Sequence, residues 1–445
     1  MSEDVITEIY NCFHPFVPLP AGDPAYVDCS AVRGDENIFR ELGRKIIRSN
    51  PATCQVYTGH RGVGKTTELL RLREYLKSKG CFVVYFGATD KDIDEQDAQY
   101  TDILLACTRH ILEDLKDYSD PKPLLNWLSS RWEELKNLAL SEVNFENLQI
   151  EAQISLFAKL TARLRATPST REQIRREVDI HTVSLLEALN EFIDRAKKNL
   201  PAGKSKLVVI ADNLDRIVPV TRQDGRNNHD EIFIDRSGQL KALDCHVIYT
   251  VPISLVYSNR SSEIRDNYDT PQVLPMVKVK DKENNLYQPG IEKFRELIEK
   301  RIGGVAAAKN LALDTEIFDS EETRVKLSKM SGGHVREMML LIQTAIDWID
   351  DLPITASAVQ RAITEARNNT YRATVDDEDW IKLAEVYREK RIPNEDEYRD
   401  LLFRRCVLEY REATSTGEIE RWHDVHPIIV DIAEFQEALQ KVETP

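Results

Sequence analysis

The chain lacks the cysteine spacing of a zinc ribbon or a redox pair. Its seven cysteines are scattered, and no two of them form a C-x-x-C pair. An odd set of isolated cysteines is typical of buried free thiols in a reducing compartment. We therefore expect neither a disulfide framework nor a cysteine-based metal site.

The chain also lacks a secretory signal and a membrane span. Its first residues, MSEDVITEIYNCF, are acidic and have no basic region before an apolar run. The most apolar stretch, Val247–Tyr257, is too short to cross a bilayer and contains Pro252. These absences predict a cytoplasmic protein with no membrane partner.

Positive charge is in deficit, because 60 Lys and Arg face 75 Asp and Glu and leave a net charge of −15. Such a balance disfavours a dedicated nucleic-acid wrapper, although a local basic patch remains compatible with it. Hydrophobic residues are 42% and charged residues 30% of the chain. This composition excludes disorder, collagen and a coiled coil for the chain as a whole, and 445 residues predict two or three domains.

One motif stands out between an apolar strand-like segment, 54–57, and a leucine-rich helical segment, 67–76. It matches G-x-x-x-x-G-K-[ST] at every position and is followed by Thr67: Gly59, His60, Arg61, Gly62, Val63, Gly64, Lys65 and Thr66. Its glycines allow backbone N–H groups to surround a β-phosphate at a helix N-terminus. We expect Lys65 to reach the β- and γ-phosphates of ATP and Thr66 to hold Mg²⁺. The alternative is a chance match in an ordinary turn.

A P-loop needs an acidic group on a neighbouring strand, and the apolar run 207–211 ends in Asp212. We expect a buried parallel strand whose Asp212 holds Mg²⁺ through water. The alternative is a plain core strand followed by an acidic turn.

The position after Asp212 bears on the rate of hydrolysis. Many hydrolysing P-loop proteins place a Glu there, whereas this chain has Asn213, which orients water but cannot accept its proton. Asp215 is a substitute base if its turn points inward. We therefore expect slow or conditional hydrolysis.

Two further strands are predicted at 82–86 and 245–250. The second ends in Thr250, where a γ-phosphate sensor would stand. The alternative for Thr250 is a strand-end hydroxyl that satisfies the backbone.

With these motifs the chain resembles the AAA+ and STAND superclass of P-loop ATPases, with a layout similar to the Orc/Cdc6-like branch. The stretch Asp212-Asn213-Leu214-Asp215-Arg216 is similar to the acidic motif of KAP and STAND NTPases. Arg33-Gly34-Asp35-Glu36 resembles the box near the adenine, which implies nucleotide contacts for Arg33 and Gly34. Ser331–Met338 resembles the sensor-2 turn of a helical lid.

The sensor-2 resemblance implies that Arg336 leans over the γ-phosphate. The alternative is a surface arginine in a first helical turn, a position that the helix dipole does not favour. The resemblance covers residues 25–370 in pieces, and it departs from the family at Asn213, in the long segment 90–200, and in the lack of tandem C-terminal repeats.

A helical insertion is predicted over 98–200, and it contains Trp127 and Trp132. For its arginines we favour solvated helix faces over a docking surface: Arg163, Arg165, Arg171, Arg175 and Arg176. By the resemblance, Arg260 or Arg265 is a candidate for an arginine that acts in trans on a neighbouring subunit's nucleotide. The alternative for each is an ordinary loop arginine.

Residues 371–445 predict helices followed by a hairpin around Thr414-Ser415-Thr416-Gly417, which indicates a winged helix. This segment has 11 Lys and Arg against 19 Asp and Glu. Because phosphate contacts dominate DNA affinity, the acidic balance favours a protein contact or an intramolecular latch over a duplex reader. His423 and His426 lack a nearby Cys and do not predict a metal site.

The predicted fold is α/β: a three-layer P-loop core with a parallel sheet over 1–285 carrying the insertion, a helical lid over 286–370, and a winged-helix-like domain over 371–445. The predicted function is binding of ATP or ADP with Mg²⁺ and slow hydrolysis, used as a conformational or oligomerisation switch. The resemblance implies self-association, signalling or antiviral defence in a prokaryote, and a separate effector or sensor partner. Two alternatives stay open: a DNA-associated loader or transposition ATPase, and a scaffold that holds nucleotide without hydrolysing it.

Overall fold

The structure is a computed structural model. It describes residues 3–34, 37–131, 134–135, 149–166, 168–222, 225–393, 395–414 and 416–443. Asp35, Glu36, Trp132 and Ser415, which the sequence analysis names, lie outside these ranges.

The chain forms two compact units. The P-loop unit contains Met1–Asn37, Gly59–Leu70 and Val273–Pro445, and the sheet unit contains Ile38–Thr58 and Arg71–Gln272. The domain boundaries drawn from the sequence at 285 and 370 stay a prediction.

A five-stranded sheet has the order β2-β3-β4-β1-β5, and the pairs β2–β3, β3–β4 and β4–β1 are parallel. Its strands are β1 (Cys54–Gly59), β2 (Cys81–Gly87), β3 (Lys206–Asp212), β4 (His246–Thr250) and β5 (Gln272–Leu274). Val209 of β3 stands between Val84 of β2 and Val247 of β4, and all three side chains are buried. Strands buried on both faces read as continuous apolar runs, which is why the four strands predicted from the sequence are confirmed.

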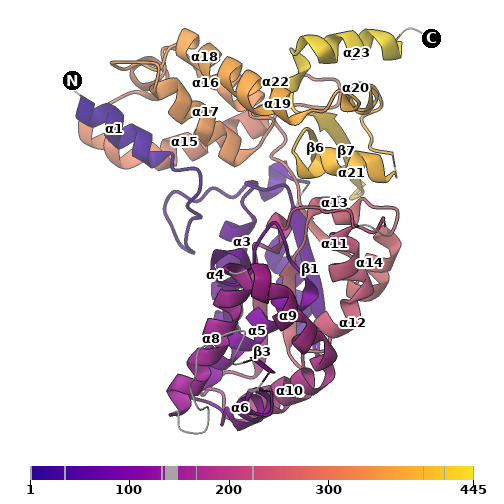
Figure 1. Cartoon of the computed structure of the whole chain (residues 1–445). Coiled ribbons are helices and arrows are strands. Elements are labelled where there is room, and N and C mark those ends of the chain that lie inside the picture. The colour runs from indigo at the N-terminus through magenta and orange to yellow at the C-terminus, as the bar shows by residue number, and fades with distance from the viewer. Residues whose placement is uncertain are drawn as a thin grey trace. The chain divides into compact units, whose positions relative to one another are not determined.

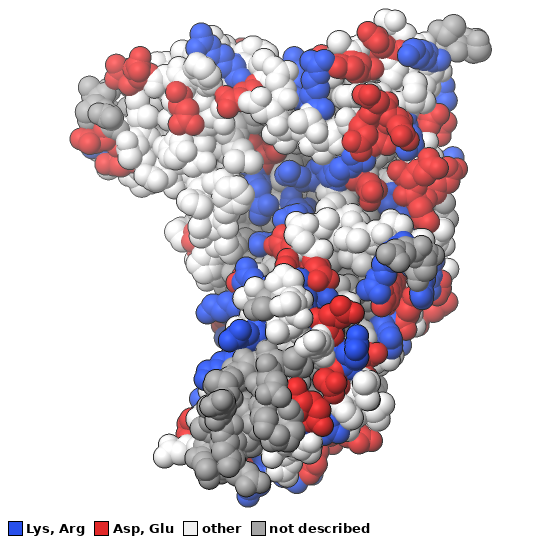
Figure 2. All heavy atoms as spheres, in the orientation of Figure 1, with Lys and Arg blue, Asp and Glu red and all other residues white. Residues whose placement is uncertain are grey.

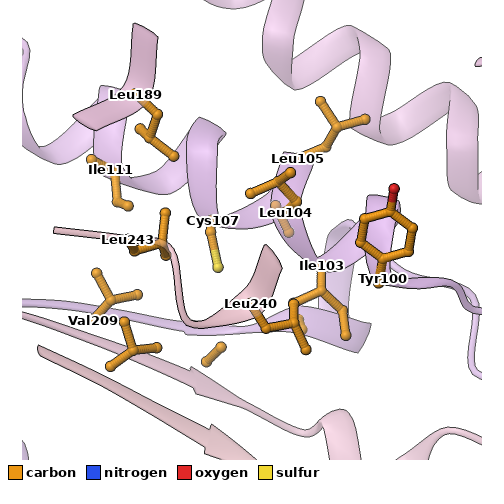
Figure 3. Close-up of a cluster of buried hydrophobic side chains, with 14 of the residues drawn as sticks. Tyr100, Ile103, Leu104, Leu105, Cys107, Ile111, Leu189, Val209, Leu240 and Leu243 are labelled. Carbon is orange, nitrogen blue, oxygen red and sulfur yellow. The ribbon is translucent and has the colours of Figure 1, made fainter. Parts of the chain in front are cut away.

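The described part of the predicted insertion is mostly helical. Its helices are α5 (Tyr100–Leu115), α6 (Lys122–Ser129), α8 (Ile150–Ala166), α9 (Pro168–Ile180) and α10 (Thr182–Lys198). Figure 3 shows Ile103, Leu104 and Cys107 of α5 in one cluster with Val209 of β3 and Leu189 of α10. The insertion therefore builds one continuous core with the strands.

Shorter elements complete the sheet unit. They are η2 (Phe39–Gly43), α2 (Arg44–Arg48), α4 (Ala88–Lys91), η4 (Leu214–Arg216), α11 (Asn228–Asp230), η5 (Glu231–Asp235), α12 (Ser237–Leu240), α13 (Ile253–Val256) and α14 (Ser261–Tyr268). The helix α3 (Lys65–Ser78) begins in the P-loop unit and ends in the sheet unit.

In the P-loop unit the lid helices pack together, coloured orange in Figure 1. They are α15 (Gln288–Lys309), α16 (Glu321–Met330), α17 (Val335–Ile346) and α18 (Ala356–Ala366), joined by η6 (Leu313–Ile317). The N-terminal elements are α1 (Glu3–Cys12) and η1 (Ser30–Val32). The Thr355 hydroxyl accepts a hydrogen bond from the Ala358 N–H at 3.2 Å and caps α18, as the sequence predicts.

The predicted hairpin near the C-terminus is confirmed. Strands β6 (Val407–Ala413) and β7 (Ile419–Val425) are antiparallel, with Tyr410 opposite Trp422. The surrounding helices are η7 (Arg367–Tyr371), α19 (Arg372–Thr374), α20 (Asp379–Glu389), η8 (Asp396–Tyr398), α21 (Arg399–Phe403), α22 (Pro427–Val430) and α23 (Ala433–Glu443). We call β6 and β7 together the wing.

The expectation of solvated insertion arginines is wrong for Arg171 and Arg175. The Arg175 guanidinium donates to Asp102 at 2.9 Å and to Asp97 at 2.8 Å, while Arg171 binds Asp94 at 2.8 Å. Both arginine side chains are almost fully buried. Asp102 also caps α5 by accepting the Gln99 N–H at 3.0 Å. The arginines thus hold acidic residues around the start of α5, a contact that helical periodicity does not reveal.

We predict that Arg175→Ala lowers the free energy of unfolding by about 3–5 kcal/mol, because it leaves the Asp102 carboxylate buried without its cation. The matched control is Arg176→Ala, since Arg176 pairs with Glu172 at 3.7 Å on an exposed face. Its effect should stay below about 0.5 kcal/mol. Urea denaturation of both variants is the measurement, and equal effects would contradict a structural role for the buried cluster.

Candidate functional site

The segment Gly59–Thr66 links β1 to α3 and has the backbone of a phosphate-binding loop. Gly59, Gly62 and Gly64 adopt φ values of +146°, +89° and +113°, which residues with a side chain rarely adopt. The helix α3 begins at Lys65. The N–H groups of a first helical turn have no intrahelical partner and carry partial positive charge, so this end of the loop is suited to an anion.

Lys65 is folded over its own loop. Its ammonium donates to the carbonyl of Gly59 at 2.7 Å and to that of His60 at 2.8 Å, and its side chain is buried. Thr66 is half-buried in the first turn of α3. The neighbouring Thr67 hydroxyl accepts the Leu19 N–H at 3.2 Å, so the N-terminal segment is tied to α3 beside the loop.

The lid contacts the outer side of the loop through the start of α17. The His334 ring donates from Nε2 to the Arg61 carbonyl at 2.5 Å, and the Arg336 N–H donates to the Gly62 carbonyl at 3.3 Å. His334 Nδ1 accepts the Glu337 N–H at 3.0 Å and so caps α17. This pair of bonds fixes the neutral tautomer of His334 with its proton on Nε2.

The Arg336 side chain lies elsewhere than over the loop. Its Nε donates to the Pro15 carbonyl at 3.1 Å, and the guanidinium stacks 5.3 Å from the centre of the Phe16 ring. The sensor-2 turn is therefore joined to the P-loop by the His334 ring and the Arg336 backbone N–H. Contact of the Arg336 guanidinium with a γ-phosphate stays a prediction.

The N-terminal box also reaches the loop. Arg33 is buried, and its Nη2 donates to the Val63 carbonyl at 2.9 Å. Gly34 has φ +76°, and a Cβ there would lie 2.7 Å from Cβ of Arg411 in the wing. The structure thus brings Arg33 to the P-loop and Gly34 against the wing, and the nucleotide contacts that the resemblance implies for both stay a prediction.

The wing contributes a residue that sequence reasoning missed. The Glu409 N–H donates to Nε2 of His60 at 3.1 Å, and both residues are fully buried. Burial lowers the pKa of His60 to about 3. His60 occupies a variable position of the motif, and no local pattern links it to a strand that lies 349 residues further along the chain.

In the sheet unit, Asp212 ends β3 and is fully buried. Its Oδ2 accepts the Tyr85 hydroxyl at 2.8 Å and its Oδ1 accepts the Asn213 N–H at 2.7 Å. Burial and the Asp212 charge raise the pKa of Tyr85. Tyr85 is a site residue that the sequence analysis missed, although its place at the end of β2, beside β3, is a usable signal.

Asn213 has φ +68°, a left-handed conformation that Asn tolerates better than Glu. Its amide donates to Asp90 at 3.3 Å. Asp215 is buried within η4. The backbone at Asn213 therefore gives a structural reason for the absence of Glu, and a base role for Asp215 stays a prediction.

The Thr250 hydroxyl accepts the Leu214 N–H at 2.9 Å and is fully buried. This is the backbone-satisfying contact that the sequence analysis kept as the alternative. A sensor role for Thr250 stays a prediction. Thr66 and Asp212 belong to different units, so their joint binding of Mg²⁺ stays a prediction as well.

Arg260 is held by two acidic side chains, Glu263 at 2.7 Å and Asp235 at 2.8 Å. To act in trans on a neighbouring subunit's nucleotide, Arg260 would have to leave these two partners. The action in trans stays a prediction for Arg260 and for Arg265 of α14.

His423 and His426 are buried in the P-loop unit, where the Tyr371 hydroxyl lies 2.9 Å from Nε2 of His426. Among the residues that the structure describes, no three His, Cys, Asp or Glu side chains are grouped to hold a metal ion. Within the same residues, no helix has the length and apolar character that a bilayer crossing requires.

No protein-family model and no curated protein matches the chain. Solved structures similar to it include the Orc1 protein of Aeropyrum pernix in complex with DNA, at 12% identity and a TM-score of 0.37 over 97% of this chain and 96% of that one. Cdc6p from Pyrobaculum aerophilum has 13% identity and a TM-score of 0.36 over 91% and 92%.

The Orc2 protein of Aeropyrum pernix, solved in ADPNP–ADP complexes, has 11% identity and a TM-score of 0.41 over 98% of each chain. Similarity at this level carries no activity, ligand or partner over to this chain.

The pKa values of four buried histidines predict how the stability of the P-loop unit depends on pH. Burial lowers the pKa of His60 to about 3 and that of His423 to about 4, and it lowers those of His334 and His426 as well. An unfolded histidine titrates near 6.5, so the unfolded chain binds more protons below that pH. The contribution of these histidines to the free energy of unfolding is therefore complete above pH 6.5. It falls as the pH decreases below 6.5, by about 1.4 kcal/mol per pH unit for each histidine.

Urea denaturation between pH 7.5 and 5.0 measures this dependence. In His60→Gln, whose side-chain oxygen can still accept the Glu409 N–H, the loss should be smaller by about 1.4 kcal/mol per pH unit below 6.5. An unchanged slope in this variant would contradict a neutral buried His60.

Proposed function

We propose that the chain binds ATP with Mg²⁺, hydrolyses it slowly, and uses the bound nucleotide as a conformational switch. The observation that carries the proposal is the loop Gly59–Thr66 with three glycines at positive φ and an α-helix that begins at Lys65. Bound ATP supplies a phosphate chain that attracts the Lys65 ammonium and the first-turn N–H groups of α3.

The contacts around the loop support a switch. His334, the Arg336 N–H and Arg33 hold the consecutive carbonyls of residues 61–63, and they come from the lid and from the N-terminal box. A change in the loop backbone must therefore move or break bonds to both elements. The proposed role of nucleotide is to select between two arrangements of the lid.

Slow hydrolysis is proposed from the residues after Asp212. Asn213 cannot accept a proton from water, and its left-handed backbone turns its amide toward Asp90. This observation also favours a second candidate, a scaffold that retains ATP without cleaving it. Phosphate release by concentrated protein distinguishes the two, because a scaffold releases none.

The remaining parts of the proposal rest on resemblance. The likeness to AAA+ ATPases supports self-association with an arginine acting in trans. The likeness to STAND-type ATPases supports a role in signalling or antiviral defence with a separate effector partner. The acidic balance of residues 371–445 disfavours DNA binding, and red Asp and Glu side chains gather over the C-terminal helices in Figure 2.

The first test identifies the nucleotide that the purified protein carries, released by denaturation and separated by chromatography, followed by calorimetric titration with Mg-ATP. We predict that Lys65→Ala weakens ATP binding about 10- to 100-fold, the loss of a charge-assisted hydrogen bond of about 1.5–3 kcal/mol. Lys309→Ala, at the exposed end of α15, is the matched control and should bind as the wild type does. Equal binding by wild type and Lys65→Ala would contradict the proposed site.

A further inference from the structure

A basic surface lies where η2 and α2 pack against the second half of α3. Gly43 allows the close approach, because a Cβ there would lie 3.1 Å from the Tyr75 ring, and the centres of the Phe39 and Tyr75 rings are 5.0 Å apart. The two packed segments, 38–50 and 71–80, carry eight Lys and Arg against two Glu, in a chain whose net charge is −15. We call the exposed side of these two segments the basic face.

Three arginines of the basic face follow one another at intervals of four residues. Arg40, Arg44 and Arg48 are exposed, while Leu42 and Ile46 of the same segment are buried. Like charges four residues apart on a helix destabilise it by about 0.2–0.5 kcal/mol per pair. Among the residues that the structure describes, no acidic side chain forms an ion pair with Arg44 or Arg48. The repulsion within the basic face is therefore relieved when carboxylates of another surface approach it.

The same chain carries a surface of opposite charge among its C-terminal helices, where red side chains gather in Figure 2. Residues 376–379 and 395–400 contain eight Asp and Glu against one Arg, and seven of these acids are exposed. Lys382 joins the two stretches, because its ammonium lies 3.1 Å from Asp379 and 3.6 Å from Glu397. We call the seven exposed acids the acidic face.

Part of the acidic face is neutralised within the chain, and part of it is not. Arg404 binds Asp376 at 2.9 Å. Asp377 and Glu378 are exposed and form no ion pair with any residue that the structure describes. Their carboxylates are thus available to guanidinium groups of another molecule, and arginine–carboxylate pairs are among the stronger charge-assisted hydrogen bonds.

We propose that the basic face of one copy of this chain binds the acidic face of a second copy. This inference rests on the self-association in the proposed function and names the two surfaces that meet, and it involves neither the P-loop residues nor nucleotide. Because the two faces differ, the contact is heterologous, and each bound copy keeps one face for a further copy, which gives rings or filaments. A nucleic acid is the other polyanion that a basic face would suit, and the net charge of −15 disfavours it.

The test follows the sedimentation coefficient of the full-length chain as a function of its concentration. One variant, Arg44→Glu with Arg48→Glu, reverses charge on the basic face, and the other, Asp377→Arg with Glu378→Arg, reverses charge on the acidic face. We expect each variant alone to self-associate at least about 10-fold more weakly than the wild type, because like charges then meet. Raising NaCl from about 50 to about 500 mM should weaken the association of the wild type, since salt screens exposed charges.

A mixture of the two variants separates a lost contact from a misfolded protein. The first variant has two acidic faces and the second has two basic faces, so every contact between them joins opposite charges. We expect the equimolar mixture to regain association. The matched control is Arg163→Glu with Arg176→Glu, which changes the net charge equally at exposed positions of α8 and α9 and should associate as the wild type does.

Equal loss of association in the control, or no recovery in the mixture, overturns the contact between the two faces. Binding of a short DNA duplex that depends on Arg44 and Arg48, with unchanged self-association, overturns it as well and assigns the basic face to nucleic acid. Association that is the same in the wild type and in every variant overturns the two faces but keeps the proposed self-association. A wild type that stays monomeric overturns both, whereas calorimetric titration with Mg-ATP tests the nucleotide site separately.

Discussion

A loop that directs its N–H groups toward an anion leaves its carbonyls on the other side, and buried carbonyls need donors. In this chain every carbonyl of residues 59–63 accepts a hydrogen bond. Lys65 serves the first two, and His334, the Arg336 N–H and Arg33 serve the next three. The donors come from three parts of the P-loop unit, namely the start of α3, the start of α17 and the N-terminal segment, so this requirement ties these parts together.

The requirement also explains which residues stand around the loop. A histidine at the N-terminus of α17 can donate from one nitrogen to Arg61 while the other nitrogen caps the helix. Only the neutral ring performs both tasks, and burial lowers the pKa of His334 well below its usual value. Structural stability and the position of the loop are thereby linked through one side chain.

The sequence predicted the local features of this site. Apolar runs located β1 to β4, the motif located the loop, and the paired glycines before Val335 located the turn that begins α17. Residues distant in sequence were not accessible to the same reasoning. No periodicity connects His60 with Glu409 or Tyr85 with Asp212. The acidic partners of Arg175 are Asp97, before α5, and Asp102, in the first turn of α5.

The two halves of the predicted nucleotide site differ in how their polar groups are satisfied. Asp212 already has hydrogen-bond donors in Tyr85 and Asn213, so a water-mediated metal ion would share the carboxylate with them. Lys65, in contrast, donates to the carbonyls of Gly59 and His60 within its own loop. His60 offers its carbonyl to this lysine and its ring to the Glu409 N–H, so one residue of the loop joins the lysine to β6. The edge of β6 at Glu409 is thereby covered by the loop and by Met276, as the edges of strands in folded proteins normally are.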